Sequence, residues 1–588
     1  METKWTRYYG SSVFTPEIDT SKTLYGALTD AVGKYSDRIA YEYFSNKITY
    51  KMMLTYVDDC ASRLAKQGVS QGDVVLMSCS GTPYQVIIFY AVNKIGARAV
   101  FVPGNLARSE FAKETNRLGV KLALLSVDAF MRFREVIPNT GIDKIILGRY
   151  GDFVKIQDRF NVCFWRLKSL DKIDITAQRK ELNKELLFWS DIAGDEVPPV
   201  ESVGSPDDTA VFFLNGSAAG SSNVVDLSSR AINEEAKISG FLYGKEPVRI
   251  YSFIRLAFTF GLCFGLHTAL MCGHTVIIYN QIPYQVPHAA LNYFKPDVLL
   301  GYPRILTALV ENRNVNLSVF RGIRTIFSGG NIMLGGDYHK INDYFRKRNM
   351  NPDVVRIYGV TETSSVCMYK PASVRNDRAV GIPLPGVRVK VLNTENLAEQ
   401  PYGVNGMLAV NTPAAMTRYE DSPENTEVVM KRMRDDSLWV LSGELGNVDE
   451  QGLFYYSGSR RIFDRDGLPV YPQYIENEIM MVRGVESCCA VPLVRDGSTI
   501  IKVAIQPEQE YLFDNDKLNA LKDEIEAMCR LELTEPMLPD QYEMMAYLPT
   551  GHFGRVDYEK VLEIFKEEED EKQDPDYIGD VFDPVNGV

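Results

Sequence analysis

Residues 358–362 read Tyr-Gly-Val-Thr-Glu, YGVTE, and this pentapeptide is the most informative short stretch of the 588-residue chain. By itself it is typical of a strand end followed by a turn, with a threonine that can cap the turn. It follows two segments with the pattern of strand-to-turn units, KPDVLLGYP at 295–303 and IRTIFSGG at 323–330. Five residues alone do not distinguish a structural turn from a binding site, so the rest of the chain decides between them.

Strand and helix patterns alternate before and after this region. The clearest examples are the amphipathic-helix pattern of 54–69 (LTYVDDCASRLAKQGV), the buried-strand pattern of 73–79 (DVVLMSC) and the glycine-terminated helix pattern of 84–96 (YQVIIFYAVNKIG). Residues 230–244 (RAINEEAKISGFLYG) predict a further helix, with Ser228 or Ser229 as its N-cap. Such alternation predicts an α/β fold built from βαβ units with parallel sheets.

The pattern changes beyond Ala379. Short strands with glycine and proline turns, such as GIPLPGVRVKVLN from Gly381, predict a small β-rich subdomain. A compact α+β unit with a helix from about Asn515 follows, and the chain ends in an acidic stretch that is low in apolar residues. We therefore expect an N-terminal domain over 1–460, with its β-rich subdomain at about 379–460, a C-terminal domain over 461–570 and an acidic tail over 571–588.

A second informative stretch is the glycine-rich segment 215–223, NGSAAGSSN, which follows the apolar run AVFFL. Small side chains allow backbone N–H groups to close around an anion without steric cost, so the composition is typical of a phosphate-binding loop. The segment contains no lysine. A flexible connector is the alternative, although such linkers rarely lie between two buried strands.

The composition indicates a soluble protein that acts on small molecules. A net charge of −13 and a pI near 5.2 argue against a nucleic-acid or anionic-membrane surface. Nine cysteines without zinc-like spacing and only five histidines predict reduced, buried thiols in a cytoplasmic protein, and no histidine-built metal site. The N-terminus has no apolar core typical of a signal peptide. The apolar span Leu256–Gly273 predicts a buried helix leading into a strand rather than a membrane span.

Several separated segments, in this order, resemble the adenylate-forming superfamily of acyl-CoA synthetases, luciferases and peptide-synthetase adenylation domains. YGVTE matches the family's YGxTE, and NGSAAGSSNVV aligns without a gap to TSGTTGxPKGV. LSGELGNVDEQGLFYYSG resembles the block TGDxGxxDxxGxxxxxGR, and GLPVYPQYIE matches GxxVxPxxIE at every fixed position. The resemblance covers nearly the whole chain. It implies a large α/β domain followed by a small C-terminal domain that rotates during the reaction.

The resemblance also implies roles for particular residues. Glu362 holds Mg²⁺ and Thr361 contacts the α-phosphate, because a hard cation prefers a carboxylate and a charged reaction centre needs neutralising donors. Glu444, where the family has an aspartate, and Arg460 hold the ribose; a strictly gapless alignment would put Ser459 in place of Arg460. The remaining nucleotide-binding residues are Asn215, Gly216, Ser217, Ala218, Ala219, Gly220, Asn223, Ser328, Gly329, Gly330, Tyr358 and Gly359.

Three departures from the family pattern concern chemistry. Asn223 stands at the lysine of the phosphate loop, and Arg555, in LPTGHFGRVDYEKV, stands at the lysine that acts in adenylation. Arginine retains the charge but presents a rigid fork instead of a compact ammonium group. The block after Gly458 is one residue shorter than in the family, with Arg461 as the hinge residue.

In such enzymes ATP and a carboxylic acid give an acyl-adenylate and pyrophosphate, and a thiol then displaces AMP. The implied activity is an AMP-forming ligase that uses ATP, Mg²⁺ and CoA. The substrate pocket is expected at Phe258, Gly330 and Gly359, and an apolar or aromatic acid is favoured because FTFGL from Phe258 offers no carboxylate to an amino group. Two alternatives stay open: transfer to the phosphopantetheine thiol of a separate acyl carrier protein, and a nucleotide- or acyl-binding homologue with little activity.

Overall fold

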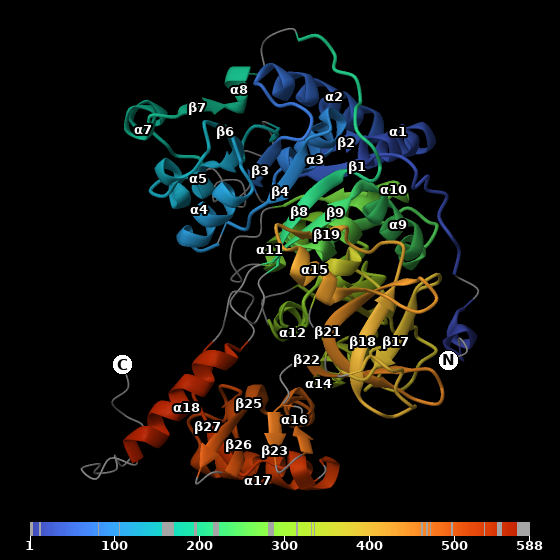
Figure 1. Cartoon of the computed structure of the whole chain (residues 1–588), viewed down its shortest axis with the longest axis vertical. Coiled ribbons are helices and arrows are strands. Elements are labelled where there is room, and N and C mark those ends of the chain that lie inside the picture. The colour runs from blue at the N-terminus through green and yellow to red at the C-terminus, as the bar shows by residue number, and fades with distance from the viewer. Residues whose placement is uncertain are drawn as a thin grey trace. The chain divides into compact units, whose positions relative to one another are not determined.

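The computed structural model describes residues 4–10, 13–79, 81–104, 106–155, 170–192, 197–215, 223–279, 287–312, 316–330, 332–333, 335–394, 396–459, 463–465, 468–470, 472–495, 498–533, 535–549 and 556–572. The chain divides into two compact units (Figure 1). The first comprises Met1–Met333, Asp337–Ser442 and Asn447–Tyr455, and the second comprises Leu334–Gly336, Gly443–Gly446 and Tyr456–Val588.

The first unit contains a nine-stranded sheet whose centre is parallel. In spatial order its strands are β16 (Ile382–Pro383), β15 (Met368–Tyr369), β14 (Asp353–Tyr358), β13 (Thr325–Ser328), β12 (Val298–Gly301), β10 (Arg249–Ser252), β11 (Thr275–Ile277), β1 (Ile39–Tyr43) and β2 (Asn46–Thr49). The run from β14 to β1 is parallel, and β15, β16 and β2 are antiparallel additions at the edges. The carboxyl ends of the central strands therefore share one edge of the sheet, where ligands bind in open α/β sheets.

A second, eight-stranded sheet also has a parallel centre. Its strands are β19 (Arg418–Glu420), β9 (Asn223–Ser228), β8 (Thr209–Asn215), β4 (Arg98–Phe101), β3 (Val74–Ser78), β5 (Leu122–Ser126), β6 (Lys144–Gly148) and β7 (Glu185–Phe188). β8 and β9 form an antiparallel hairpin, and β19 adds to β9 in antiparallel orientation. The glycine-rich segment 216–222 connects β8 to β9 and lies outside the described residues.

Helices complete the α/β layers of the first unit. They are α1 (Leu24–Tyr35), α2 (Tyr50–Lys66), α3 (Pro83–Ile95), α4 (Arg108–Arg117), α5 (Val127–Phe133), α7 (Ile175–Leu182), α8 (Trp189–Ile192), α9 (Ser229–Ser239), α10 (Ala269–Met271), α11 (Pro287–Phe294), α12 (Pro303–Glu311), α13 (Leu317–Phe320), α14 (Gly335–Arg346) and α15 (Pro423–Val429), with the π-helix η5 (Phe260–Thr268) and the 3-10 turns η1 (Lys4–Tyr8), η2 (Ile137–Asn139), η4 (Gly240–Tyr243) and η6 (Thr361–Thr363). α3 is buried on all sides, whereas α2 turns only one face to the core.

A five-stranded β-rich sheet follows. It contains β17 (Arg388–Leu392), β18 (Gly406–Asn411), β21 (Leu438–Val448) and β20 (Met430–Arg432), with β22 (Phe454–Ser459) paired to β21. The short strand patterns predicted beyond Ala379 thus correspond to antiparallel β-structure. β21 and β22 carry the chain into the second unit.

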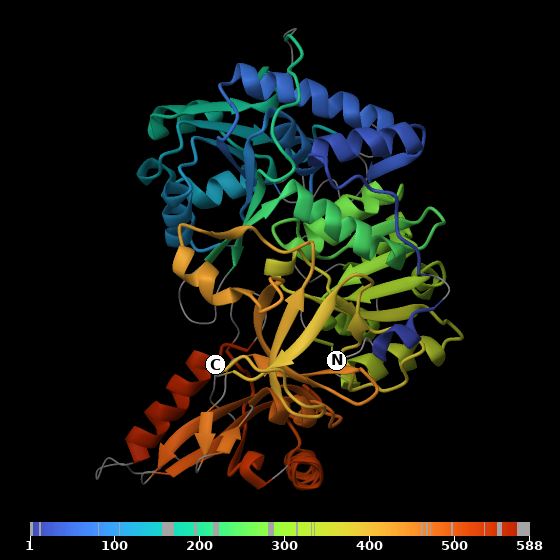
Figure 2. The same ribbon diagram turned by 45° about the vertical axis from the view of Figure 1, so that its right-hand side comes forward.

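The second unit is built on a three-stranded sheet of β25 (Val485–Arg495), β26 (Ser498–Pro507) and β27 (Gln541–Met544). α16 (Pro472–Ile479) and α17 (Asn515–Glu532) contribute to the hydrophobic core on one face, and α18 (Tyr558–Lys572) packs on the other through Val561 and Phe565 (Figure 2). The hairpin β23 (Phe463–Arg465) and β24 (Leu468–Val470) and the turn η7 (Glu535–Met537) complete it.

The α/β class and the main elements predicted from the sequence are confirmed, with one clear correction. The helix predicted over 230–244 ends at Ser239 and continues as the 3-10 turn η4. At Gly240 a Cβ atom would lie 2.6 Å from Sγ of Cys272, the residue that follows α10, so the chain packs closely there. Ser228, not Ser229, is the N-cap, and its side chain accepts a hydrogen bond from Ala231 N.

The apolar span at Leu256–Gly273 forms η5 and α10 and leads into β11, as expected. Every helix in the described part of the chain is too short or too polar to cross a lipid bilayer. All eight cysteines within that part are free, and seven of them are buried.

Candidate active site

The YGVTE stretch forms a tight reversal at the carboxyl end of β14. β14 ends at Tyr358, the 3-10 turn η6 contains Thr361 and Glu362, and the chain returns as β15. Ser364 and Ser365 have positive φ angles of 59° and 143°, which non-glycine residues rarely adopt. Such strain persists only where surrounding contacts hold it, and it is typical of functional sites.

Gly359 is required by this reversal. A Cβ atom on Gly359 would lie 1.4 Å from the carbonyl oxygen of Ser365, because the two sides of the turn approach each other backbone to backbone. Cys367 N donates a hydrogen bond to Tyr358 O at 2.8 Å and closes the turn. The glycine of the motif is therefore explained by packing within the turn itself.

The Glu362 side chain is buried, and its position is fixed by contacts distant in sequence. Its Oε1 accepts a hydrogen bond from the Tyr419 hydroxyl at 2.6 Å, and its backbone carbonyl accepts one from Met416 N at 2.8 Å. Burial, followed by the neighbouring Glu362 charge, raises the pKa of Tyr419 well above its ordinary value, so this hydroxyl remains a donor. Thr361, on the same turn, is half-buried.

The strand that follows the glycine-rich segment, β9, pairs with β19, which carries Tyr419. Tyr419 on β19 is directly opposite Val225 on β9. Asn223 is two residues before Val225, so Asn223 and Tyr419 project from the same face of the sheet. Asn223 Oδ1 accepts a hydrogen bond from Asn425 Nδ2 at 3.0 Å. The position where the family pattern has lysine is thus held by a neutral amide pair.

A buried acid on α9 also contacts the end of this turn. Glu235 on α9 is fully buried, and its Oε1 accepts a hydrogen bond from Val366 N at 3.1 Å. Desolvation raises the pKa of Glu235 to about 8, so this carboxyl group is mainly protonated at neutral pH. On β9, burial likewise raises the pKa of Asp226 to about 6, although Arg418 Nη2 lies 3.2 Å from its Oδ2.

The glycine pair after β13 lies under aromatic and aliphatic side chains. A Cβ atom on Gly329 would meet Ile357 and Phe260, and one on Gly330 would meet Tyr302. The Phe258 side chain is half-buried, and its backbone carbonyl accepts hydrogen bonds from Gly261 N and Leu262 N at the start of η5. Phe260 of this segment therefore lies against the glycine pair, and the substrate-pocket role predicted for Phe258 stays a prediction.

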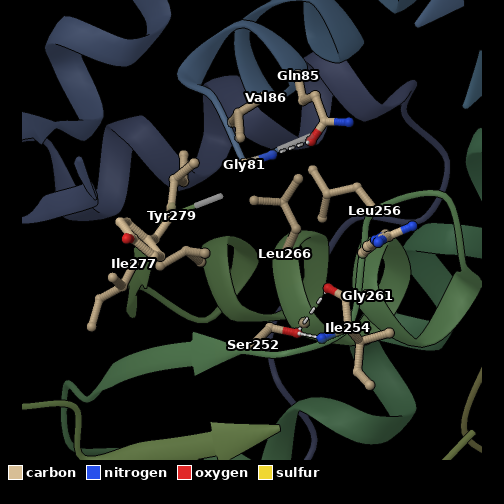
Figure 3. Close-up of a pocket in the computed structure, with 14 residues that line it drawn as sticks. Gly81, Gln85, Val86, Ser252, Ile254, Leu256, Gly261, Leu266, Ile277 and Tyr279 are labelled. Carbon is tan, nitrogen blue, oxygen red and sulfur yellow. Dashed lines mark hydrogen bonds between the residues drawn. The ribbon is translucent and has the colours of Figure 1, made fainter. Parts of the chain in front are cut away.

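A cavity of about 60 Å³ lies between η5, α3 and the ends of β10 and β11 (Figure 3). Its lining is mainly apolar, with Val86, Leu266 and Ile277 among the contributing residues. Gly261 lines it, while the preceding Phe260 packs towards Gly329, so the first turn of η5 separates the cavity from the glycine pair.

Of the remaining predicted site residues, Asn215 ends β8 and Ser328 ends β13 in the first unit, and the others lie in the second unit or outside the described residues. Glu444 lies half-buried in β21, within Gly443–Gly446, which groups with the second unit. Residues 216–220 of the phosphate loop, Arg460, Arg461 and Arg555 lie outside the described residues. Their predicted roles stay predictions.

A protein-family model described as AMP-binding enzyme matches residues 28–420, about two thirds of the chain. The chain belongs to the AMP-binding enzyme family. The match spans the strand after the glycine-rich segment, the YGVTE turn and Tyr419. The adenylate-forming resemblance inferred from the motifs is therefore confirmed.

Curated relatives of this AMP-binding enzyme are full-length matches at low identity. A long-chain-fatty-acid–CoA ligase of Bacillus subtilis is 22% identical over 560 residues, covering 92% of this chain and 94% of the relative. Another of Haemophilus influenzae is 24% identical over 584 residues, covering 95% of this chain and 97% of the relative. Their lengths and coverage agree with membership of the AMP-binding enzyme family over most of the chain.

Solved structures confirm the fold. The anthranilate CoA ligase AuaEII in complex with anthranoyl-AMP gives a TM-score of 0.77 at 15% identity, covering 94% of this chain and 99% of that one. The amide bond synthetase McbA from Marinactinospora thermotolerans gives a TM-score of 0.75 at 19% identity, covering 92% and 99%. At these identities the likeness shows the fold of the AMP-binding enzyme alone.

Among its described residues, the AMP-binding enzyme has no cluster of three or more His, Cys, Asp or Glu side chains that could hold a metal ion. A single carboxylate fits Mg²⁺ nevertheless, because this ion is usually held by one or two carboxylates together with substrate phosphates. Glu362 is suited to hold the ion, since its side chain is buried at the turn and is oriented by the Tyr419 hydroxyl.

Proposed function

We propose that this protein is an AMP-forming carboxylic acid:thiol ligase that activates a carboxylic acid with ATP and transfers the acyl group to CoA. The observation that carries the proposal is the Tyr419–Glu362 hydrogen bond, which orients a buried acid beside the strand that begins at Asn223. The family match and the full-length CoA-ligase relatives support it.

In the first half-reaction a carboxylate oxygen of the substrate attacks the α-phosphorus of ATP, and pyrophosphate leaves. The two anions repel each other, so the protein must supply donors and cations that act on the charge of the transition state. Thr361 contacts the α-phosphate, and segment 215–223 wraps the β- and γ-phosphates through backbone N–H groups. Mg²⁺, held by Glu362, neutralises phosphate charge when it is bound.

Further roles are proposed for residues of the C-terminal region. Glu444 and Arg460 hold the ribose hydroxyls, and Arg555 supplies the positive charge at the substrate carboxylate and the α-phosphate. In the second half-reaction the thiol sulfur attacks the acyl carbonyl carbon, and AMP leaves. Rotation of the C-terminal domain about Arg461 would allow one site to serve both steps.

We propose an apolar or aromatic carboxylic acid as the substrate. The side chains that approach Gly329 and Gly330 are those of Phe260, Ile357 and Tyr302, none of which offers a carboxylate to an ammonium group. This environment disfavours an α-amino acid, because a buried ammonium group requires a charged partner.

A second function is supported by a specific observation. Asn223, at the lysine position of the phosphate loop, is paired with Asn425 through neutral amides. A site with less phosphate neutralisation suits a nucleotide- or acyl-binding protein with little synthetase activity. ATP-dependent pyrophosphate exchange with a panel of carboxylic acids separates the two functions. If no acid supports exchange but AMP or ATP still raises the melting temperature, the binding function is correct.

Glu362→Gln tests the proposed site directly. The amide keeps the shape of the side chain and can still accept the Tyr419 hydrogen bond, but it removes the negative charge. We expect acyl-AMP formation to fall by about 100-fold or more, as for other oriented catalytic groups, while the melting temperature changes little. Retained exchange activity would overturn the assignment of Glu362. Acyl transfer to CoA and to a carrier protein, measured in parallel, identifies the acceptor.

A further inference from the structure

Residues 414–420, which we call the strap, contact both the YGVTE turn and β9. Towards the turn, the Ser364 hydroxyl donates to Ala414 O at 2.7 Å and Met416 N donates to Glu362 O at 2.8 Å. Towards the sheet, Thr417 N donates to Asp226 O at 2.9 Å, and the strap continues as β19. The strap therefore joins the metal-binding turn to the strand that begins at Asn223.

Tyr419 is the strap residue whose side chain reaches the reactive part of the turn. Its ring is buried, and its hydroxyl lies 2.6 Å from Glu362 Oε1. The bond therefore fixes the orientation of the Glu362 carboxyl group within a buried site.

The register of β19 determines that Tyr419 points towards Glu362. A slip by one residue would turn Tyr419 to the opposite face of the sheet. Arg418 holds the register through Asp226 at 3.2 Å, and Tyr419 N donates to the Thr426 hydroxyl at 2.9 Å. These two contacts, from the Arg418 side chain and to the Thr426 hydroxyl, hold the short edge strand β19 in register.

We propose that Tyr419 is a positioning residue that orients the Glu362 carboxylate for Mg²⁺–ATP. This inference rests on the proposed function, since it assumes that Glu362 holds the ion. Tyr419 acts through Glu362 and is not itself in contact with substrate. Because Tyr419 lies on β19, which pairs with β9, the same contact also links the Glu362 carboxyl group to β9.

The test is the Mg²⁺ dependence of ATP binding, measured by calorimetry in the full-length protein without carboxylic acid or CoA. Tyr419→Phe keeps the ring and removes only the hydroxyl. We expect the Mg²⁺ concentration for half-maximal enhancement of ATP binding to rise about 10-fold or more, because loss of a group that orients a metal ligand costs 10–100-fold in metal affinity. ATP binding without Mg²⁺ should change little.

Tyr243→Phe is the matched control. It also removes a buried tyrosine hydroxyl, which donates to Phe264 O at 3.0 Å in the middle of η5 and, in the described part of the chain, makes no hydrogen bond to the strap. We expect a similar loss of melting temperature and an unchanged Mg²⁺ requirement. Ser364→Ala, which removes a different strap contact, should raise the Mg²⁺ requirement in the same direction and serves as the second variant if Tyr419→Phe is poorly folded.

The outcomes distinguish the metal-binding role of Glu362 from the positioning role of Tyr419. If the wild-type protein binds ATP without any dependence on Mg²⁺, the proposed role of Glu362 is wrong. If the wild type depends on Mg²⁺ and Glu362→Gln removes the dependence, but Tyr419→Phe behaves like Tyr243→Phe, the metal assignment stands and the positioning role of Tyr419 is overturned.

Discussion

Replacing Glu235 by glutamine should remove a large part of the pH dependence of stability. The Glu235 carboxyl group is fully buried on α9 and accepts the Val366 N–H at the end of the YGVTE turn. Its Oε2 is buried without a hydrogen-bond partner among the described residues, and the nearby Ser239 hydroxyl donates to the Glu235 backbone carbonyl instead. Glutamine has the shape of the protonated acid and can still accept from Val366.

The sign follows from the pKa of Glu235, which burial raises from an ordinary value of 4.5 to about 8. Between these pH values the folded protein retains a proton that the unfolded chain has lost, so the free energy of unfolding falls as pH rises. The contribution is fully present below about pH 4.5 and is lost once the pH passes about 8. With about 1.4 kcal/mol per pKa unit, the loss between about pH 5 and pH 7.5 is about 3 kcal/mol.

The assay is urea unfolding of wild type and Glu235→Gln at these two pH values. Any cost of the buried amide to the free energy of unfolding is the same at the two pH values, so it cancels in the comparison. Titrations that wild type and variant share, including that of Asp226, cancel as well. We expect the variant to gain about 3 kcal/mol relative to wild type on going from the lower to the higher pH. Glu234→Gln, one residue away and half-exposed, is the control and should show no such gain. Parallel pH profiles for wild type and Glu235→Gln would refute the reasoning.

Two further substitutions test the turn and the phosphate loop. Asn223→Lys should tighten ATP binding about 10-fold in calorimetry and leave AMP binding unchanged, since a charge about 4 Å from a phosphate is worth roughly 1–4 kcal/mol; equal effects on both nucleotides would contradict a β/γ-phosphate contact. Gly359→Ala should lower the free energy of unfolding by about 3 kcal/mol or more and abolish nucleotide binding, because the added methyl group would lie 1.4 Å from Ser365 O. A variant with wild-type urea stability and ATP affinity would show that the turn can open at little cost.

The elements that the sequence predicted well are those whose pattern is local. The helix predicted at 84–96 is α3, buried on all sides and ended by Gly96 in the left-handed conformation. The buried strand predicted at 73–79 is β3, and the helix predicted from about Asn515 is α17. In these segments apolar periodicity, a glycine at the helix end and turn residues all indicate the same element, so neighbouring residues suffice to specify it.

The contacts that shape the candidate site have no such local signal. Tyr419 is 57 residues from Glu362, Glu235 is 131 from Val366, and Asn425 is 202 from Asn223. Each of these partners reads as an ordinary helix or strand residue in its own segment. The contact of Phe260 with the glycine pair likewise has no local signal, because Phe258 and Phe260 lie in the same apolar run.

The site is also where local preferences are violated, which explains why sequence reasoning ends there. Ser364 and Ser365 take positive φ angles, and Glu235 keeps an acid in the core. Neither feature would form in an isolated peptide, since each carries a cost that only distant contacts offset. The strap and α9 both supply such contacts to this turn. The orientation of Glu362 is therefore a property of the assembled domain, and perturbing the strap at Tyr419 should alter metal dependence before it alters the fold.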